Sequence, residues 1–159
     1  MSFQIYINTD KSLHQLATEI RKLLSLPSFQ EIPGESYCQF EMLGMTLLIH
    51  HVDEEDRDPE VKHYPYSLDL QMSFSEHELD TDRMEYQLQP YYAQLLCFHL
   101  SVETAYREQK KGERLWQVRY HFCRKNHKWN GSILFGEAGW EPAVFESTPG
   151  PWRSMLPIF

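Results

Sequence analysis

Cysteine is scarce in this chain, and what little there is does not form a recognisable pattern. The 159 residues contain three cysteines, Cys38, Cys97 and Cys123, and no two of them stand at CxxC spacing. An odd and sparse set of this kind argues against a disulfide framework. It favours reduced thiols in a cytosolic protein.

Long apolar runs are missing as well. No run approaches the ~20 residues that a helix needs to span a bilayer. The N-terminal residues 1–6 lack the basic region followed by an apolar stretch that marks a signal peptide. We therefore expect a cytoplasmic protein without a membrane segment.

Positive charge is in deficit, since the net charge is −8 and the isoelectric point lies near 5.4. An acidic protein is repelled by nucleic-acid phosphates and by anionic membranes. The charge is compatible with a basic protein partner.

Catalytic and cofactor motifs are also absent. The chain has no Gly-x-Ser-x-Gly elbow, no His-Glu-x-x-His and no phosphate-binding Gly-x-x-x-x-Gly-Lys-Ser/Thr. The sequence consequently specifies no nucleophile and no cofactor.

The composition that remains is that of a folded protein. Hydrophobic residues make up 42% of the chain, charged residues 24% and aromatic residues 14%, whereas disordered chains are poor in aromatics. A chain of this length can bury a sizeable core, so we expect one domain over residues 1–159.

Period-two alternation of apolar and polar residues predicts most of the strands. Its clearest case is Tyr64–Phe74. The predicted strands are 3–7, 36–42, 45–52, 64–74, 114–124 and, after Asn130-Gly131, 132–135. The segment 45–52 is apolar on both faces, which places it centrally in a sheet. In 114–124, Val118 and Tyr120 fall on one face with Trp116 and Phe122, and His121 and Cys123 on the other.

Two helices are predicted. The first follows Ser12, which stands three residues before Gln15 in the spacing of a capping box, and its apolar stripe runs from Leu13 to Leu24. The second begins at Pro90, carries a stripe that reaches Tyr106, and ends at Glu108–Gly112.

These elements follow one another in the order β-α-β-β-β-α-β-β. Short breaks between strands favour antiparallel pairing. We therefore predict an α+β fold, a mostly antiparallel sheet with two helices. The C-terminal segment 136–159 is rich in proline, glycine and aromatic residues and is predicted to be irregular. Its end, 150–159, would either pack on the domain or serve as a docking peptide.

Charge is distributed unevenly along the chain. Asp53–Glu60 holds six acids and one arginine, a net of −5, and Glu76–Glu85 holds five acids and one arginine, a net of −4. Tyr106–Lys128 has eight basic and two acidic residues, a net of +6. The candidate partner-binding residues are Asp53, Glu54, Glu55, Asp56, Asp58, Glu60, Glu76, Glu78, Asp80 and Asp82.

The two acidic stretches flank the strand 64–74, which would separate them by roughly 35 Å into two patches. One interpretation is that they are solvated loops that keep the protein soluble. The other is a landing surface for a basic partner, because complementary charge speeds encounter and selects partners.

Two metal sites are conceivable from the residue types present. Asp53–Glu60 fails as a calcium loop, because an EF-hand starting at Asp53 would need Gly at position 58 and a ligand at Tyr64. His121, Cys123 and His127 lie close together, but no fourth zinc ligand is specified. The sequence therefore predicts no metal.

Two further functions remain open as alternatives. His50 or His51, next to acids at a strand end, could act as a general base in an enzyme with a dispersed histidine and carboxylate site. The basic segment 114–128, with Arg119 and Lys125, could bind nucleic acid. The leading hypothesis is a small acidic protein–protein interaction module, for example an inhibitor or immunity-type protein that neutralises a basic enzyme.

Overall fold

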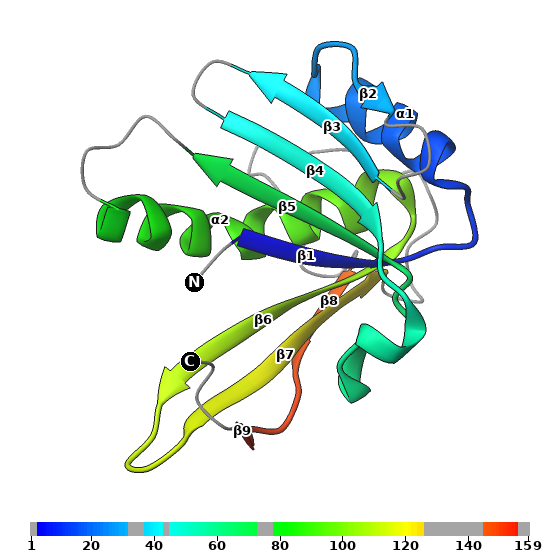
Figure 1. The fold of residues 1–159 in the computed structure, drawn as a ribbon. Coiled ribbons are helices and arrows are strands. Elements are labelled where there is room, and N and C mark those ends of the chain that lie inside the picture. The colour runs from blue at the N-terminus through cyan, green and yellow to red at the C-terminus, as the bar shows by residue number, and fades with distance from the viewer. Residues whose placement is uncertain (1–2, 32–36, 43–44, 73–77, 126–144, 156–159) are drawn as a thin grey trace, which may run out of the picture.

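The computed structural model describes residues 3–31, 37–42, 45–72, 78–125 and 145–155 (Figure 1). Positions 30, 31, 42, 72, 78–87, 125, 145 and 146 are described by their backbone only. The predicted strand 132–135 lies outside the described residues.

Two helices and nine strands make up the described part of the chain. The first half contains β1 (Phe3–Asn8), α1 (Leu13–Leu24), β2 (Gln30–Glu31), β3 (Tyr37–Met42), β4 (Met45–His51) and β5 (Tyr66–Met72). The second half contains α2 (Glu78–Leu100), β6 (Glu103–Lys111), β7 (Trp116–Lys125), β8 (Phe145–Pro149) and β9 (Arg153–Met155). Two short 3-10 turns, Glu54–Asp56 and Pro59–Val61, lie between β4 and β5.

The strands form one sheet in the order β2-β3-β4-β5-β1-β6-β7-β8, and β9 also pairs with β7. Every pairing among the described strands is antiparallel. The predicted α+β class, with an antiparallel sheet and two helices, is confirmed, and β4 lies between two partner strands as predicted. Pairing between β1 and β6 covers only Ile5–Asn8, so the long β6–β7 hairpin diverges from the rest of the sheet (Figure 1).

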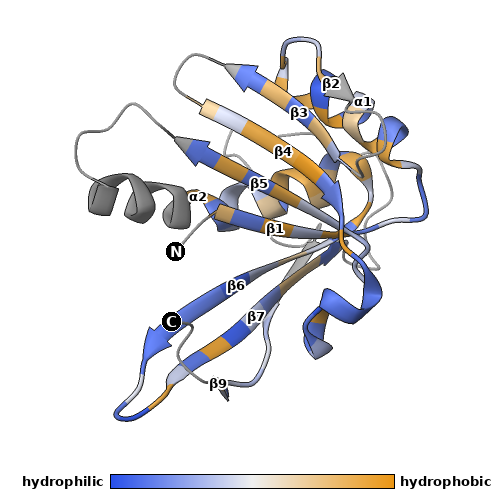
Figure 2. Cartoon of the chain, viewed as in Figure 1, coloured by the Kyte–Doolittle hydropathy of each residue, from blue (hydrophilic) through white to orange (hydrophobic). Residues whose placement is uncertain are grey.

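Alternation along the strands divides the apolar core between the two faces of the sheet. The larger cluster joins Phe3, Ile5 and Ile7 of β1 to buried residues of α1 and α2. Both helices cover the same face of the sheet (Figure 1). The smaller cluster lies on the opposite face and consists of Tyr6, Val61, Tyr64, Ala105, Val118 and Tyr120. Hydrophobic residues dominate β4, whereas the turn after it is hydrophilic (Figure 2).

Local signals in the sequence account for α1. Ser12 and Gln15 form the predicted capping box, with each side chain bonded to the other residue's backbone N–H. Leu16, Ala17 and Ile20 are buried on the predicted apolar face. The helix ends at Ser25, whose φ of 53° is left-handed.

The prediction for the second helix is wrong at both ends. α2 begins at Glu78, so Pro90 lies inside the helix and not at its start. The residues after Pro90 that face the sheet, Ala93, Leu96 and Cys97, are fully buried. Packing of this face against the sheet offsets the cost of an internal proline.

The helix ends at Leu100, because Ser101 adopts a left-handed φ of 56°. Tyr106 and the segment predicted as the helix end belong to β6, where Tyr106 pairs with Ile5 and with His121. Glu108, Gln109 and Lys110, all helix-forming residues, are here held in a strand by pairing with β7. Tertiary pairing has overridden local propensity.

The C-terminal residues are more regular than predicted where they are described. β8 and β9 both pair with β7, and Met155 packs on the smaller cluster. Trp152 lies under two cations, with Lys110 Nζ 3.9 Å and the Arg119 guanidinium carbon 4.5 Å from its ring centre. Residues 145–155 are thus packed on the domain.

Candidate functional site: an anchored acidic turn

The segment Asp53–Glu60, here called the acidic turn, is an ordered structure on the face of the sheet opposite the helices. Val52 N–H donates to the carbonyl of Pro65 at 2.8 Å and so closes the connection between β4 and β5. Val61, at the end of the turn, is fully buried in the smaller cluster.

Arg57 holds the turn together from inside. Its Nε donates to the carbonyl of Val52 and its Nη1 to the carbonyl of Lys62, both at 2.8 Å. The guanidinium therefore caps backbone carbonyls at the two ends of the turn and bonds to none of its carboxylates.

Four of the acids point outward. Asp53, Glu54, Glu55 and Asp56 are all exposed. Their described contacts are few: Asp53 Oδ1 lies 3.8 Å from His51 Nδ1. The outer end of the turn is therefore a compact group of solvated carboxylates.

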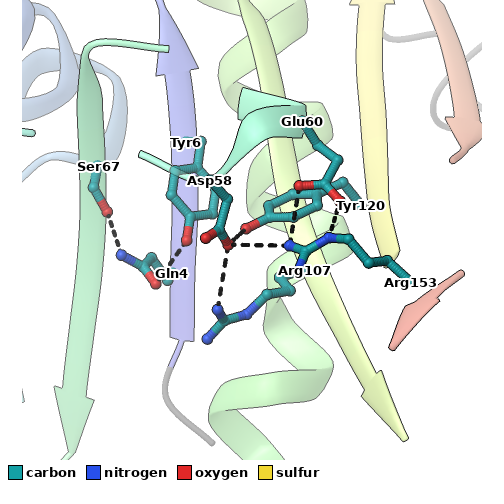
Figure 3. Close-up of polar contacts among 8 residues, drawn as sticks. All are labelled: Gln4, Tyr6, Asp58, Glu60, Ser67, Arg107, Tyr120 and Arg153. Atoms are coloured by element: carbon teal, nitrogen blue, oxygen red, sulfur yellow. Dashed lines mark hydrogen bonds and ion pairs between the residues drawn. The ribbon is translucent and has the colours of Figure 1, made fainter. Parts of the chain in front are cut away.

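The other two acids point inward and anchor the turn (Figure 3). Asp58 Oδ2 accepts a hydrogen bond from the Tyr120 hydroxyl and lies 3.7 Å from Arg107 Nη1 and 3.9 Å from Arg153 Nη2. Glu60 forms a two-pronged pair with Arg153, at 2.6 Å to Nε and 3.2 Å to Nη2. These bonds join the turn to β6, β7 and β9.

The electrostatics agree with an anchoring role. Burial raises the pKa of the Glu60 carboxyl, but the hydrogen bonds from Arg153, a backbone hydrogen bond and the Arg153 charge together outweigh it and hold the pKa below its usual range. The bond to Glu60 raises the pKa of Arg153 in turn. Burial, with the charge of Asp58 nearby, raises the pKa of Tyr120, so its hydroxyl remains a donor.

The ten predicted binding residues therefore fall into four groups. Asp53, Glu54, Glu55 and Asp56 are presented to solvent, and Asp58 and Glu60 are engaged within the protein. Glu76 lies outside the described residues. Glu78, Asp80 and Asp82 lie on the first turns of α2, where only the backbone is described.

The candidate histidines behave differently from each other. His50 Nε2 lies 3.1 Å from Asp69 Oδ2, and Asp69 Oδ1 accepts a hydrogen bond from Ser67 at 2.7 Å. Ser67 in turn accepts from Gln4 Nε2 at 3.1 Å (Figure 3). His50 and Ser67 are opposite each other in the β4–β5 register, but each side chain bonds to a different oxygen of Asp69. The Ser67 hydroxyl thus donates to Asp69, whereas a nucleophile would donate to its general base. His51 is more exposed and stacks edge-on against Tyr66.

The strand residues considered for zinc or nucleic acid are also engaged. His121 Nε2 lies 2.5 Å from Glu108 Oε2, its ring stacks on Tyr106, and Cys123 is buried in the larger cluster. Arg119 bonds to Glu108 at 2.8 Å. Within the described residues, no group of three metal-ligating side chains could hold a metal ion. His127 and Lys128 lie outside those residues.

Arg107, Tyr120 and Arg153 are the site residues that sequence reasoning missed. Arg107 falls within the predicted second helix, and Tyr120 falls on the aromatic face of the predicted strand 114–124. The separation of 93 residues between Glu60 and Arg153 leaves no local signal. The one local signal within the acidic turn is that its six acids are followed directly by the apolar residue Val61. An apolar residue at that place indicates that the end of the turn packs on the protein, so that acids near it can face inward.

Comparisons with models of known protein families, with curated proteins and with solved structures find no match. Within the described residues, no helix has the length and apolar character needed to cross a membrane. The function must therefore be inferred from the site itself.

Proposed function

We propose that this chain is a cytoplasmic protein–protein interaction module that binds a basic partner through Asp53, Glu54, Glu55 and Asp56. In the specific form of the proposal, the partner is a basic enzyme and the acidic turn occupies its cationic cleft, as an inhibitor or immunity-type protein would. The acids at 76–82 would contribute a second patch.

One observation carries the proposal: the exposed carboxylates sit on a turn that is fixed from inside. Arg57, Val61, Asp58 and Glu60 hold the backbone by bonds and burial that leave the outer acids unneutralised. A pre-organised surface loses less conformational entropy on binding than a mobile loop does. Exposed acid on a rigid support also speeds the encounter with a basic protein.

The first experiment is a pull-down from native lysate at low salt. A basic protein that binds and is released by moderate salt is the expected result, because screening weakens contacts between exposed charges. If no stable partner is retained at low salt, the proposal fails.

The second experiment localises the contact. The triple variant Glu54→Gln, Glu55→Gln, Asp56→Asn should slow association with that partner by roughly tenfold at low salt. The matched control is Asp10→Asn, Glu41→Gln, Glu113→Gln, which removes three exposed acids elsewhere and changes net charge equally. Equal slowing in both variants, measured by stopped-flow or surface plasmon resonance, would mean that net charge alone drives binding.

A further inference from the structure

A cavity of about 190 Å³ lies between the two helices and the sheet, on the face opposite the acidic turn. Phe3 of β1, Leu47 of β4, and Leu68 and Leu70 of β5 form its floor. Leu88 and Tyr92 of α2 form one wall, and the end of α1 contributes another.

The floor of the cavity is fixed by the sheet. Leu70 lies between two direct cross-strand partners, Phe3 on β1 and Leu47 on β4. All three side chains are buried, and Leu68 is 1% exposed. Pairing with both neighbouring strands fixes the backbone of Leu70, so the floor is held in place from both sides.

The wall from α2 is equally well defined. Leu88 and Tyr92 stand one helical turn apart and so project in the same direction. The ring of Tyr92 is held edge-on by Phe3, with ring centres 5.8 Å apart, and by Tyr91 at 5.2 Å. α1 and α2 thus flank the same part of the sheet and leave a gap over its floor.

The lining determines which ligand fits. Its described side chains are aliphatic or aromatic apart from the thioether of Met45, and the Tyr92 hydroxyl is the one hydrogen-bonding donor among them. A charged ligand would lose its hydration there without a compensating partner. In another protein, an enclosed apolar cavity of about 150 Å³ takes up benzene or xenon; the present cavity is of similar size and partly open to solvent.

We propose that this cavity is a binding site for a small uncharged apolar molecule, about the size of a benzene ring. The inference is independent of the proposed function, because the cavity and the acidic turn lie on opposite faces of the sheet. The face that the helices cover would then bind a small apolar molecule, and the opposite face would bind the basic partner.

The test is a titration of the whole chain with benzene, followed in ¹H–¹³C methyl spectra. We expect saturable shift changes at the methyl groups of Leu47, Leu68 and Leu88. The methyl groups of Leu13 and Leu100, which pack on the same core but do not line the cavity, should change little. Benzoate, a charged ring of similar size, should produce no such changes.

Substitution provides the control. Leu88→Phe fills the cavity from the helix side and should weaken benzene binding at least tenfold, whereas Leu100→Phe should leave it unchanged. If the Leu88→Phe variant does not fold, the benzene titration of the wild-type protein tests the proposal by itself. Absence of saturable change up to the solubility limit of benzene, equal changes at Leu13, or unaltered binding to a folded Leu88→Phe variant would each overturn the proposal.

Discussion

At the scale of single residues, His50 shows how the sheet determines the state of a titratable group. It faces Asp69 across the β4–β5 pair, and both side chains are 28% exposed. The hydrogen bond to Asp69 raises the pKa of the imidazole above the ordinary value of 6.5, against the opposing effect of burial. The protonated ring is therefore stabilised by folding.

This shift predicts a stability that depends on pH. Because the pKa of His50 is higher in the folded state, the pair contributes fully below the unfolded pKa, and its contribution is lost as pH rises through the folded value. Between about pH 6 and pH 9, the wild type should lose roughly 1 kcal/mol more unfolding free energy than His50→Gln. Urea denaturation at both pH values measures this difference.

Exposed His63 supplies the control for that experiment. His63→Gln should follow the wild-type pH dependence. A wild type and a His50→Gln variant with parallel curves would show that the contact with Asp69 contributes nothing to stability. The sequence placed His50 next to acids along the chain, but its partner is Asp69 on the neighbouring strand, which only the register of the sheet reveals.

At the scale of elements, the β6–β7 hairpin depends on one glycine. Gly112 N–H donates to the carbonyl of Leu115 at 3.0 Å, which closes the turn. A Cβ at position 112 would lie 2.5 Å from that carbonyl oxygen, and the obstacle is backbone that cannot move aside cheaply. Glycine is therefore required here for space.

Gly112→Ala should destabilise the protein by about 1–3 kcal/mol, the usual cost of overpacking. Hydrogen exchange should accelerate first in the hairpin, since its outer part diverges from β1. Glu113→Ala, an exposed change in the same turn, should alter stability by less than about 0.5 kcal/mol. Equal stability in the two variants would show that the turn relaxes freely.

The same hairpin marks the limit of what the sequence predicts about elements. Strands with strict alternation and a helix with a capping box were found within two residues of their ends, because their signals are local. β6 was missed because Glu108–Gly112 has the pattern of a helix end, and only pairing with β7 makes residues 108–111 a strand. The start of α2 was missed because proline is favoured at the first position of a helix. Packing of the helix on the sheet instead keeps Pro90 inside α2.

At the scale of the whole molecule, Asp58 links parts of the chain that are far apart in sequence. Its carboxylate meets groups from β6, β7 and β9, and so couples the acidic turn to the hairpin and to the C-terminal strand. The sequence correctly showed a molecule with acidic and basic segments. It could not show that Asp58 and Glu60 join the two internally, because alternation and charge counts do not report which side of a turn an acid faces.

Asp58→Ala distinguishes an anchor from a binding residue without any partner present. The change leaves the fully buried Tyr120 hydroxyl without its carboxylate acceptor, so the free energy of unfolding should fall by about 1–3 kcal/mol. Asp56→Ala, an exposed acid on the same turn, should change it by less than about 0.5 kcal/mol. Amide exchange in Asp58→Ala should accelerate both at 54–61 and at 153–155, because Asp58 joins these segments. If both variants are equally stable and exchange alike, Asp58 is no anchor, and Arg57, Glu60 and buried Val61 hold the turn without it.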